Sequence, residues 1–216
     1  GGLLSTAELS VLEAQKEIAL YAQRTRKMFG FVQELLHTKK GDEFNKLYSR
    51  IEKYESISDN MEIEIANYLN SVSEGRLSSE SKLEIRGMLR EVTEIESIGD
   101  SCYNLARTIN RKRSGGMDFT EKQYEHIHQM MHLTDNALEQ MVTLVEDENH
   151  VVDVNKSFNI ENEINNYRAQ LKNQNVVDVN NKEYDYQMGV HYMDLIGECE
   201  KLGDYVVNVV EARTNV

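Results

Sequence analysis

Four short segments of the sequence place two oxygen-bearing side chains four residues apart. They are Glu55-x-x-x-Asp59, Glu96-x-x-x-Asp100, Glu161-x-x-x-Asn165 and Glu200-x-x-x-Asp204. In a helix this spacing puts both side chains on one face, about one turn apart. Clustered carboxylates repel one another unless a cation neutralises them, and oxygen ligands suit hard or borderline metal ions. The eight residues are therefore candidate metal ligands.

The four segments also form a pattern along the chain. Residues 94–100 align with residues 198–204, and Asn104 and Asn208 follow at the same offset. Residues 55–59 align more weakly with residues 161–165. One Glu-x-x-x-Asp pair is typical of any solvated acidic helix, but four copies in two matching sets indicate an internal repeat of about 104 residues.

Apolar residues at steps of three and four predict long helices that would carry these segments. The sequence contains no proline and only 12 glycines, and both residue types interrupt helices. Capping boxes at Ser5-x-x-Glu8 and Thr120-x-x-Gln123 mark two helix starts. The expected helices cover roughly residues 5–36, 44–72, 79–113, 120–145, 155–173 and 183–212.

The order of these helices predicts an all-α fold of two tandem three-helix bundles. Three helices precede the break at Gly115-Gly116 and three follow it, so we expect the halves to span residues 1–116 and 117–216. Long helices joined by short loops pack antiparallel. Within each half, the two segments lie equally far from a turn and should meet, with Gly99 and Gly203 letting the neighbouring helix come close. The expected patches are Glu55, Asp59, Glu96 and Asp100 in the first half, and Glu161, Asn165, Glu200 and Asp204 in the second.

Charge and cysteine content narrow the possible partners and the compartment. The net charge is −13, which disfavours binding to nucleic acid. Residues 1–113 hold 17 Lys and Arg against 18 Asp and Glu, whereas residues 114–216 hold 7 against 19. Cys102 and Cys199 fall on apolar stripes without metal-type spacing, so we expect buried, reduced thiols in the cytosol. No run approaches the ~20 apolar residues of a membrane span, and no signal peptide is evident.

The segments Glu96-Ser-Ile-Gly99-Asp100 and Glu200-Lys-Leu-Gly203-Asp204 resemble the motifs of the PhoU-like family. Residues 65–71 look most like the C-terminal PhoU-like domain of bacterial sodium/phosphate cotransporters, and the start at Gly1-Gly2-Leu3 fits a membrane domain upstream. The resemblance implies iron or zinc at the motifs and a regulatory, non-catalytic role in phosphate uptake. It also implies a phosphate transporter or its membrane domain as partner, and a place at the cytoplasmic face of the plasma membrane. A homodimer is compatible with it. Asn165 departs from the motif, which implies a weaker second site.

Three other readings of the chain remain open. It could be a free-standing PhoU-type regulator, or a helical scaffold whose acidic patches bind nothing. A di-iron carboxylate enzyme needs inward Glu-x-x-His motifs. Glu34-x-x-His37 and Glu125-x-x-His128 have that spacing, but both fall outside the apolar stripes.

A histidine pair and a group of basic residues are two further candidate binding sites. His128 and His132 are spaced to share a zinc ion, but no third ligand stands at a suitable spacing. The basic residues Arg107, Arg111, Lys112 and Arg113 close the third predicted helix. They would either contact an anionic membrane surface or cap the negative end of that helix.

Overall fold

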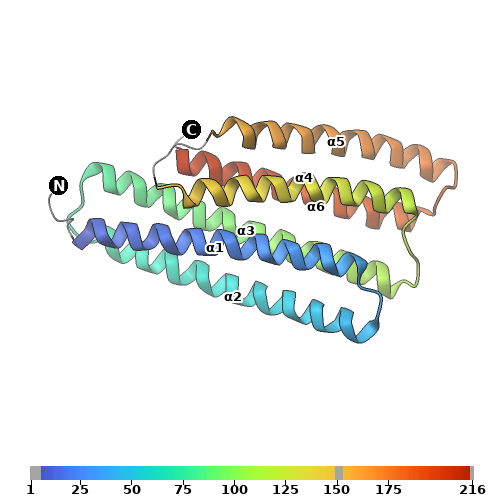
Figure 1. Ribbon diagram of the computed structural model, residues 1–216, viewed down its shortest axis with the longest axis horizontal. Coiled ribbons are helices and arrows are strands. Elements are labelled where there is room, and N and C mark those ends of the chain that lie inside the picture. The colour runs from blue at the N-terminus through green and yellow to red at the C-terminus, as the bar shows by residue number, and fades with distance from the viewer. Residues whose placement is uncertain (1–5, 149–152, 215–216) are drawn as a thin grey trace.

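The computed structural model describes residues 6–148 and 153–214, which form six helices and no strand. The helices lie along the long axis of an elongated molecule (Figure 1). They are α1 Thr6–His37, α2 Gly41–Ser73, α3 Ser79–Ser114, α4 Glu121–Glu146, α5 Asn155–Asn180 and α6 Tyr186–Thr214. The predicted all-α class of six long helices is confirmed.

The helices form two bundles that share a central contact. Helices α1, α2 and α3 pack on one another, as do α4, α5 and α6. The halves meet through α3 against α6, which is the largest contact, and through α1 against α4. As a result α2 and α5 lie at opposite edges of the molecule and touch only their own half (Figure 1).

Local signals in the sequence explain where several helices begin. Thr120 accepts a hydrogen bond from the Gln123 backbone N–H while the Gln123 side chain accepts one from the Thr120 N–H, so the predicted capping box of α4 is present. Ser78 caps α3 by accepting from the Ser81 N–H. The other predicted box begins at Ser5, which lies outside the described residues.

The turn between α5 and α6 lies later than the sequence pattern suggested. α5 continues to Asn180 rather than ending near residue 173, and α6 begins at Tyr186 rather than at residue 183. The added turns of α5 carry exposed side chains, including Val176 and Val177, so they lack the buried stripe that marks a helix. The amide of Gln174 donates to Asp178 across one of these turns, which supports the extension.

The core runs mainly along α1, α3, α4 and α6. α5, by contrast, buries only two large apolar side chains, Ile164 and Leu171. Cys102 and Cys199 are both buried and unpaired, as predicted. Among the described helices, none has a stretch with the length and hydropathy needed to cross a bilayer.

Two helical glycines allow a direct test of this packing. At Gly30 a methyl group would meet nothing within 4 Å, so Gly30→Ala should stabilise the fold by about 0.5–1 kcal/mol through helix propensity. At Gly189 the added carbon would lie 3.0 Å from Val179 Cγ2 and 3.1 Å from Asn175 Oδ1. Gly189→Ala should therefore destabilise the fold by about 1–3 kcal/mol. Urea unfolding of both variants measures the two effects, and equal shifts of the same sign would contradict this packing.

Candidate metal centre

The first half brings its predicted acids together between α2 and α3. One carboxylate oxygen each of Glu55, Asp59 and Asp100 lies within 4.8 Å of the other two. Asp100 also lies close enough to Glu55 and Glu96 to raise the pKa of both carboxyl groups. All four residues of the first predicted patch are therefore neighbours, which follows from the antiparallel α2–α3 hairpin.

Crowding perturbs the protonation of these acids. The pKa of Glu55 is raised to about 9, first by burial and then by Asp100, Asp59 and Glu96. The pKa of Glu96 is raised to about 8, again first by burial and then mainly by Asp100. In addition, Glu55 Oε2 is buried without a hydrogen-bond partner. The cluster therefore favours protons or a cation, and an oxygen-ligated metal ion fits its donor set.

The structure adds a fifth carboxylate that the motif did not indicate. Glu62 lies on α2 one turn beyond Asp59, and its pKa is raised by burial and by the charges of Asp59 and Asp100. Tyr21 of α1 lies nearby, since burial and the acids of this cluster raise its pKa, and its hydroxyl donates to the Ser58 carbonyl at 3.0 Å. We call Glu55, Asp59, Glu62, Glu96 and Asp100 the first acidic patch.

The second half brings together its own set between α5 and α6, with a different charge balance. The pKa of Glu161 is raised first by burial, then by Asp204, Glu211 and Glu200, so these acids lie close to it. However, Glu200 forms an ion pair with Arg168 at 3.5 Å. No three His, Cys, Asp or Glu side chains in the described part of this half converge as closely as in the first patch. We call Glu161, Asn165, Glu200 and Asp204, together with Arg168, the second patch.

Equivalent positions in the two halves locate the source of this difference. Gly99 of α3 lies against Ser58 and Gly203 of α6 lies against Ile164, so positions on α2 correspond to positions 106 residues later on α5. By the same offset Arg168 corresponds to Glu62. The second half thus holds a fixed cation where the first holds a carboxylate, and it also has Asn165 in place of Asp59.

The two glycines next to the aspartates do not enforce a close helix approach. A methyl group at Gly99 would lie 3.8 Å from both Glu55 Oε2 and Ser58 Cβ, and one at Gly203 would lie 3.4 Å from Ile164 Cδ1. These are ordinary van der Waals separations. The neighbouring helix does lie close at both glycines, but an added methyl group would fit at either position.

A pair of reciprocal hydrogen bonds relates the two halves across α3 and α6. The Asn104 amide donates to Glu198 at 2.8 Å, and the Asn208 amide donates to Glu94 at 3.1 Å. Asn104 and Asn208 are equivalent in the repeat, and so are Glu94 and Glu198. These asparagines therefore join the halves to each other.

Two of the four basic residues that end α3 contact segments outside this helix. Lys112 is buried and lies 2.9 Å from Asp118, and Arg113 donates to the carbonyls of Thr38 and Lys39 after the end of α1. Arg107 and Arg111 are exposed. Lys112 and Arg113 are therefore engaged with neighbouring segments of the chain. The two Glu-x-x-His motifs also lie on the surface, as predicted from their positions.

Comparison with known proteins relates this fold to a family. Residues 127–212 match the family model described as PhoU domain. No curated relative matches the sequence. The phosphate transport system regulatory protein PhoU from Streptococcus pneumoniae has a similar structure, with a TM-score of 0.80 and 15% sequence identity over 97% of this chain and 95% of that one.

Two further solved structures agree with this result. PhoU from Pseudomonas aeruginosa aligns with a TM-score of 0.83 and 12% identity over 95% of this chain and 96% of that chain. A PhoU-like protein from Shewanella oneidensis MR-1 aligns over the whole of both chains with a TM-score of 0.58 and 15% identity. At these identities the likeness shows the fold, which is that of PhoU proteins.

The raised pKa values predict how stability depends on pH without metal. The pKa values of Glu55 and Glu96, about 9 and about 8, exceed the value of 4.5 for a free glutamate, so the folded state holds more protons than the unfolded state. Stability should be highest below about pH 4.5 for these groups, and should fall as pH rises through 8 and 9. Thermal melting of chelator-treated protein from pH 5 to 9 measures this slope.

A matched pair of variants assigns the slope to the patch. Glu55→Gln should flatten the pH dependence, because the amide does not ionise. Glu64→Gln, at an exposed position on the same helix, should leave the dependence unchanged. Equal slopes in the wild type and Glu55→Gln would contradict the assignment.

Proposed function

We propose that this chain is a non-catalytic, metal-binding regulatory domain that acts in phosphate uptake. The observation that carries the proposal is the first acidic patch, where five carboxylates gather on a PhoU fold and the pKa values of Glu55, Glu62 and Glu96 are raised. The family match and the solved structure named as a phosphate transport system regulatory protein support the regulatory part.

The acids of the first patch are suited to hold iron or zinc. Glu55, Asp59 and Asp100 would supply the first oxygen ligands, since their oxygens already lie within 4.8 Å of one another. Glu96 and Glu62 would complete or orient that set. A bound ion would neutralise the patch and hold α2 against α3. In the second patch Arg168 already neutralises Glu200, so metal should bind there more weakly.

The proposed setting is the cytoplasmic face of the plasma membrane, next to a phosphate transporter or its membrane domain. The resemblance of residues 65–71 to the tails of sodium/phosphate cotransporters supports this placement. The free-standing regulator is the second candidate, and the likeness of the fold to two solved PhoU proteins favours it. Detecting the native protein in the membrane fraction, covalently joined to membrane-spanning segments, would select the cotransporter.

Metal content tests the proposal that the chain binds metal. Untagged protein should carry iron or zinc, with the first patch filled before the second. Asp100→Asn should remove most of the bound metal while circular dichroism stays helical, and Asp204→Asn should have a smaller effect. Elemental analysis and calorimetric titration give the stoichiometry. Equal losses in the two variants would contradict the ranking of the patches, and no metal in the wild type after reconstitution would contradict metal binding.

A gain-of-function variant tests why the second patch is weaker. Asn165→Asp combined with Arg168→Glu makes the second patch equivalent to the first at both differing positions. We expect a second high-affinity site per chain, measured by calorimetry with the same ion. Lys201→Glu, which adds negative charge at an exposed position on α6, is the control and should add no site.

Cellular phosphate uptake tests the proposal that the chain acts as a regulator. In the organism that encodes the chain, deletion of the gene should change the rate of phosphate uptake at high external phosphate. Asp100→Asn should reproduce the change, and Glu64→Gln should not. Unchanged uptake in the deletion strain would exclude the proposed role, whatever the metal content.

A further inference from the structure

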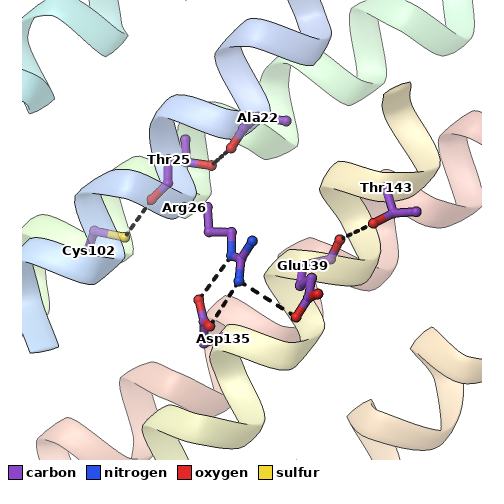
Figure 2. A network of polar contacts seen from close by, with 7 residues as sticks. All are labelled: Ala22, Thr25, Arg26, Cys102, Asp135, Glu139 and Thr143. Atoms are coloured by element: carbon purple, nitrogen blue, oxygen red, sulfur yellow. Dashed lines mark hydrogen bonds and ion pairs between the residues drawn. The ribbon is translucent and has the colours of Figure 1, made fainter. Parts of the chain in front are cut away.

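The seam between α1 and α4 is held by polar contacts. Arg26 of α1 lies 3.2 Å from Asp135 and 3.6 Å from Glu139 of α4 (Figure 2). Gln23 donates to Glu146 further along the same seam. These contacts define which face of α4 is directed toward α1.

Two histidines meet at the other end of this seam. His37, the last residue of α1, packs edge-on against His128 of α4 with ring centroids 4.4 Å apart and planes at 82°. The ring centroid of Tyr124 lies 6.1 Å from that of His37 and 6.5 Å from that of His128. The separation between positions 26 and 37 on α1 equals that between positions 128 and 139 on α4, so the histidines continue the antiparallel register set by Arg26.

A third histidine shares this face of α4. His128, His132, Asp135 and Glu139 follow at steps of three and four residues, which places them on one side of the helix. Asp135 and Glu139 contact α1. His132 therefore lies on the face of α4 that meets α1, one turn from His128. All three histidines are exposed and can change rotamer readily.

We propose that His37, His128 and His132 form a site for a divalent transition-metal ion, such as Zn²⁺ or Cu²⁺, that ties α1 to α4. Imidazole is a preferred ligand of both ions, unlike Mg²⁺ or Ca²⁺. Two imidazole nitrogens on one tetrahedral zinc ion lie about 3.3 Å apart, given metal–nitrogen distances of about 2.0–2.1 Å. Rings whose centroids are 4.4 Å apart reach this arrangement by side-chain rotation. Water completes the coordination.

The surroundings of the site favour the ligand form of histidine. Partial burial, His128 and Lys39 lower the pKa of His37, so its imidazole is neutral and free to bind metal at pH 7. The site is also separate from the first acidic patch, which lies between α2 and α3 and offers oxygen ligands. The two sites should therefore select different metal ions, and the histidine site does not depend on the proposed function.

Copper binding distinguishes this site from the acidic patches. Untagged, metal-free protein titrated with one equivalent of Cu²⁺ should show nitrogen coupling in its electron paramagnetic resonance spectrum. His37→Phe keeps an aromatic ring against His128 but removes the nitrogen ligand, so affinity should fall about tenfold or more. Asp100→Asn should leave the signal unchanged. His126→Gln is the matched control, because His126 lies on α4 but bonds to Tyr192 on α6.

Further outcomes make the test decisive. Unchanged copper affinity and nitrogen coupling in His37→Phe would overturn the proposal, because His128 and His132 alone would then be the chelate. A spectrum with only oxygen ligands in the wild type would also overturn it. Zn²⁺ should raise the melting temperature of the wild type more than that of His37→Gln, an exposed substitution that provides a second variant should His37→Phe fail to fold. Equal shifts would contradict a metal link between α1 and α4.

Discussion

The packing of α3 against α6 is the contact on which the rest of the molecule depends. Each half has three helices, and its outer helix, α2 or α5, touches only its own half. The buried faces of α3 and α6 pack against each other. Their two reciprocal Asn–Glu hydrogen bonds fix the register of this antiparallel pair. Because α3 and α6 also carry the acids that face α2 and α5, the same two helices join the halves and supply carboxylates to both patches.

The two patches show how equivalent positions can acquire different chemistry. Their backbone arrangement is similar, as the matching neighbours of Gly99 and Gly203 indicate. Their charge is not, because Arg168 stands where the first half has Glu62 and forms an ion pair with Glu200. Burial and then like charges raise the pKa values of Glu55 and Glu96 in the first patch. In the second patch burial raises the pKa of Glu200, but the charge of Arg168 opposes this rise. Two differing positions, Asn165 for Asp59 and Arg168 for Glu62, therefore give the second patch a cation of its own and one carboxylate fewer.

The sequence predicted the helices and the hairpin partners of the acids, because helical periodicity and distance from a turn are local properties. It missed Glu62 and Arg168, which lie outside the repeated motif and matter only through the neighbours that folding gives them. It also placed the end of α5 too early, because the last turns of this helix have no periodic pattern of buried apolar residues. The pairing of His37 with His128 lay beyond reach because the residues are far apart in sequence and meet only where the two halves pack.

Total charge is a poor guide to local electrostatics in this molecule. Residues 1–113 are nearly neutral and residues 114–216 strongly acidic, yet the denser carboxylate cluster lies in the neutral half. Two basic residues of that half contact other segments: Arg113 donates to carbonyls after α1, and Lys112 pairs with Asp118. None of these contacts reaches the first acidic patch. Its repulsion is therefore left for a proton or a metal ion to relieve, and because its ligands divide between α2 and α3, either one also acts on the hairpin that supports the contact with α6.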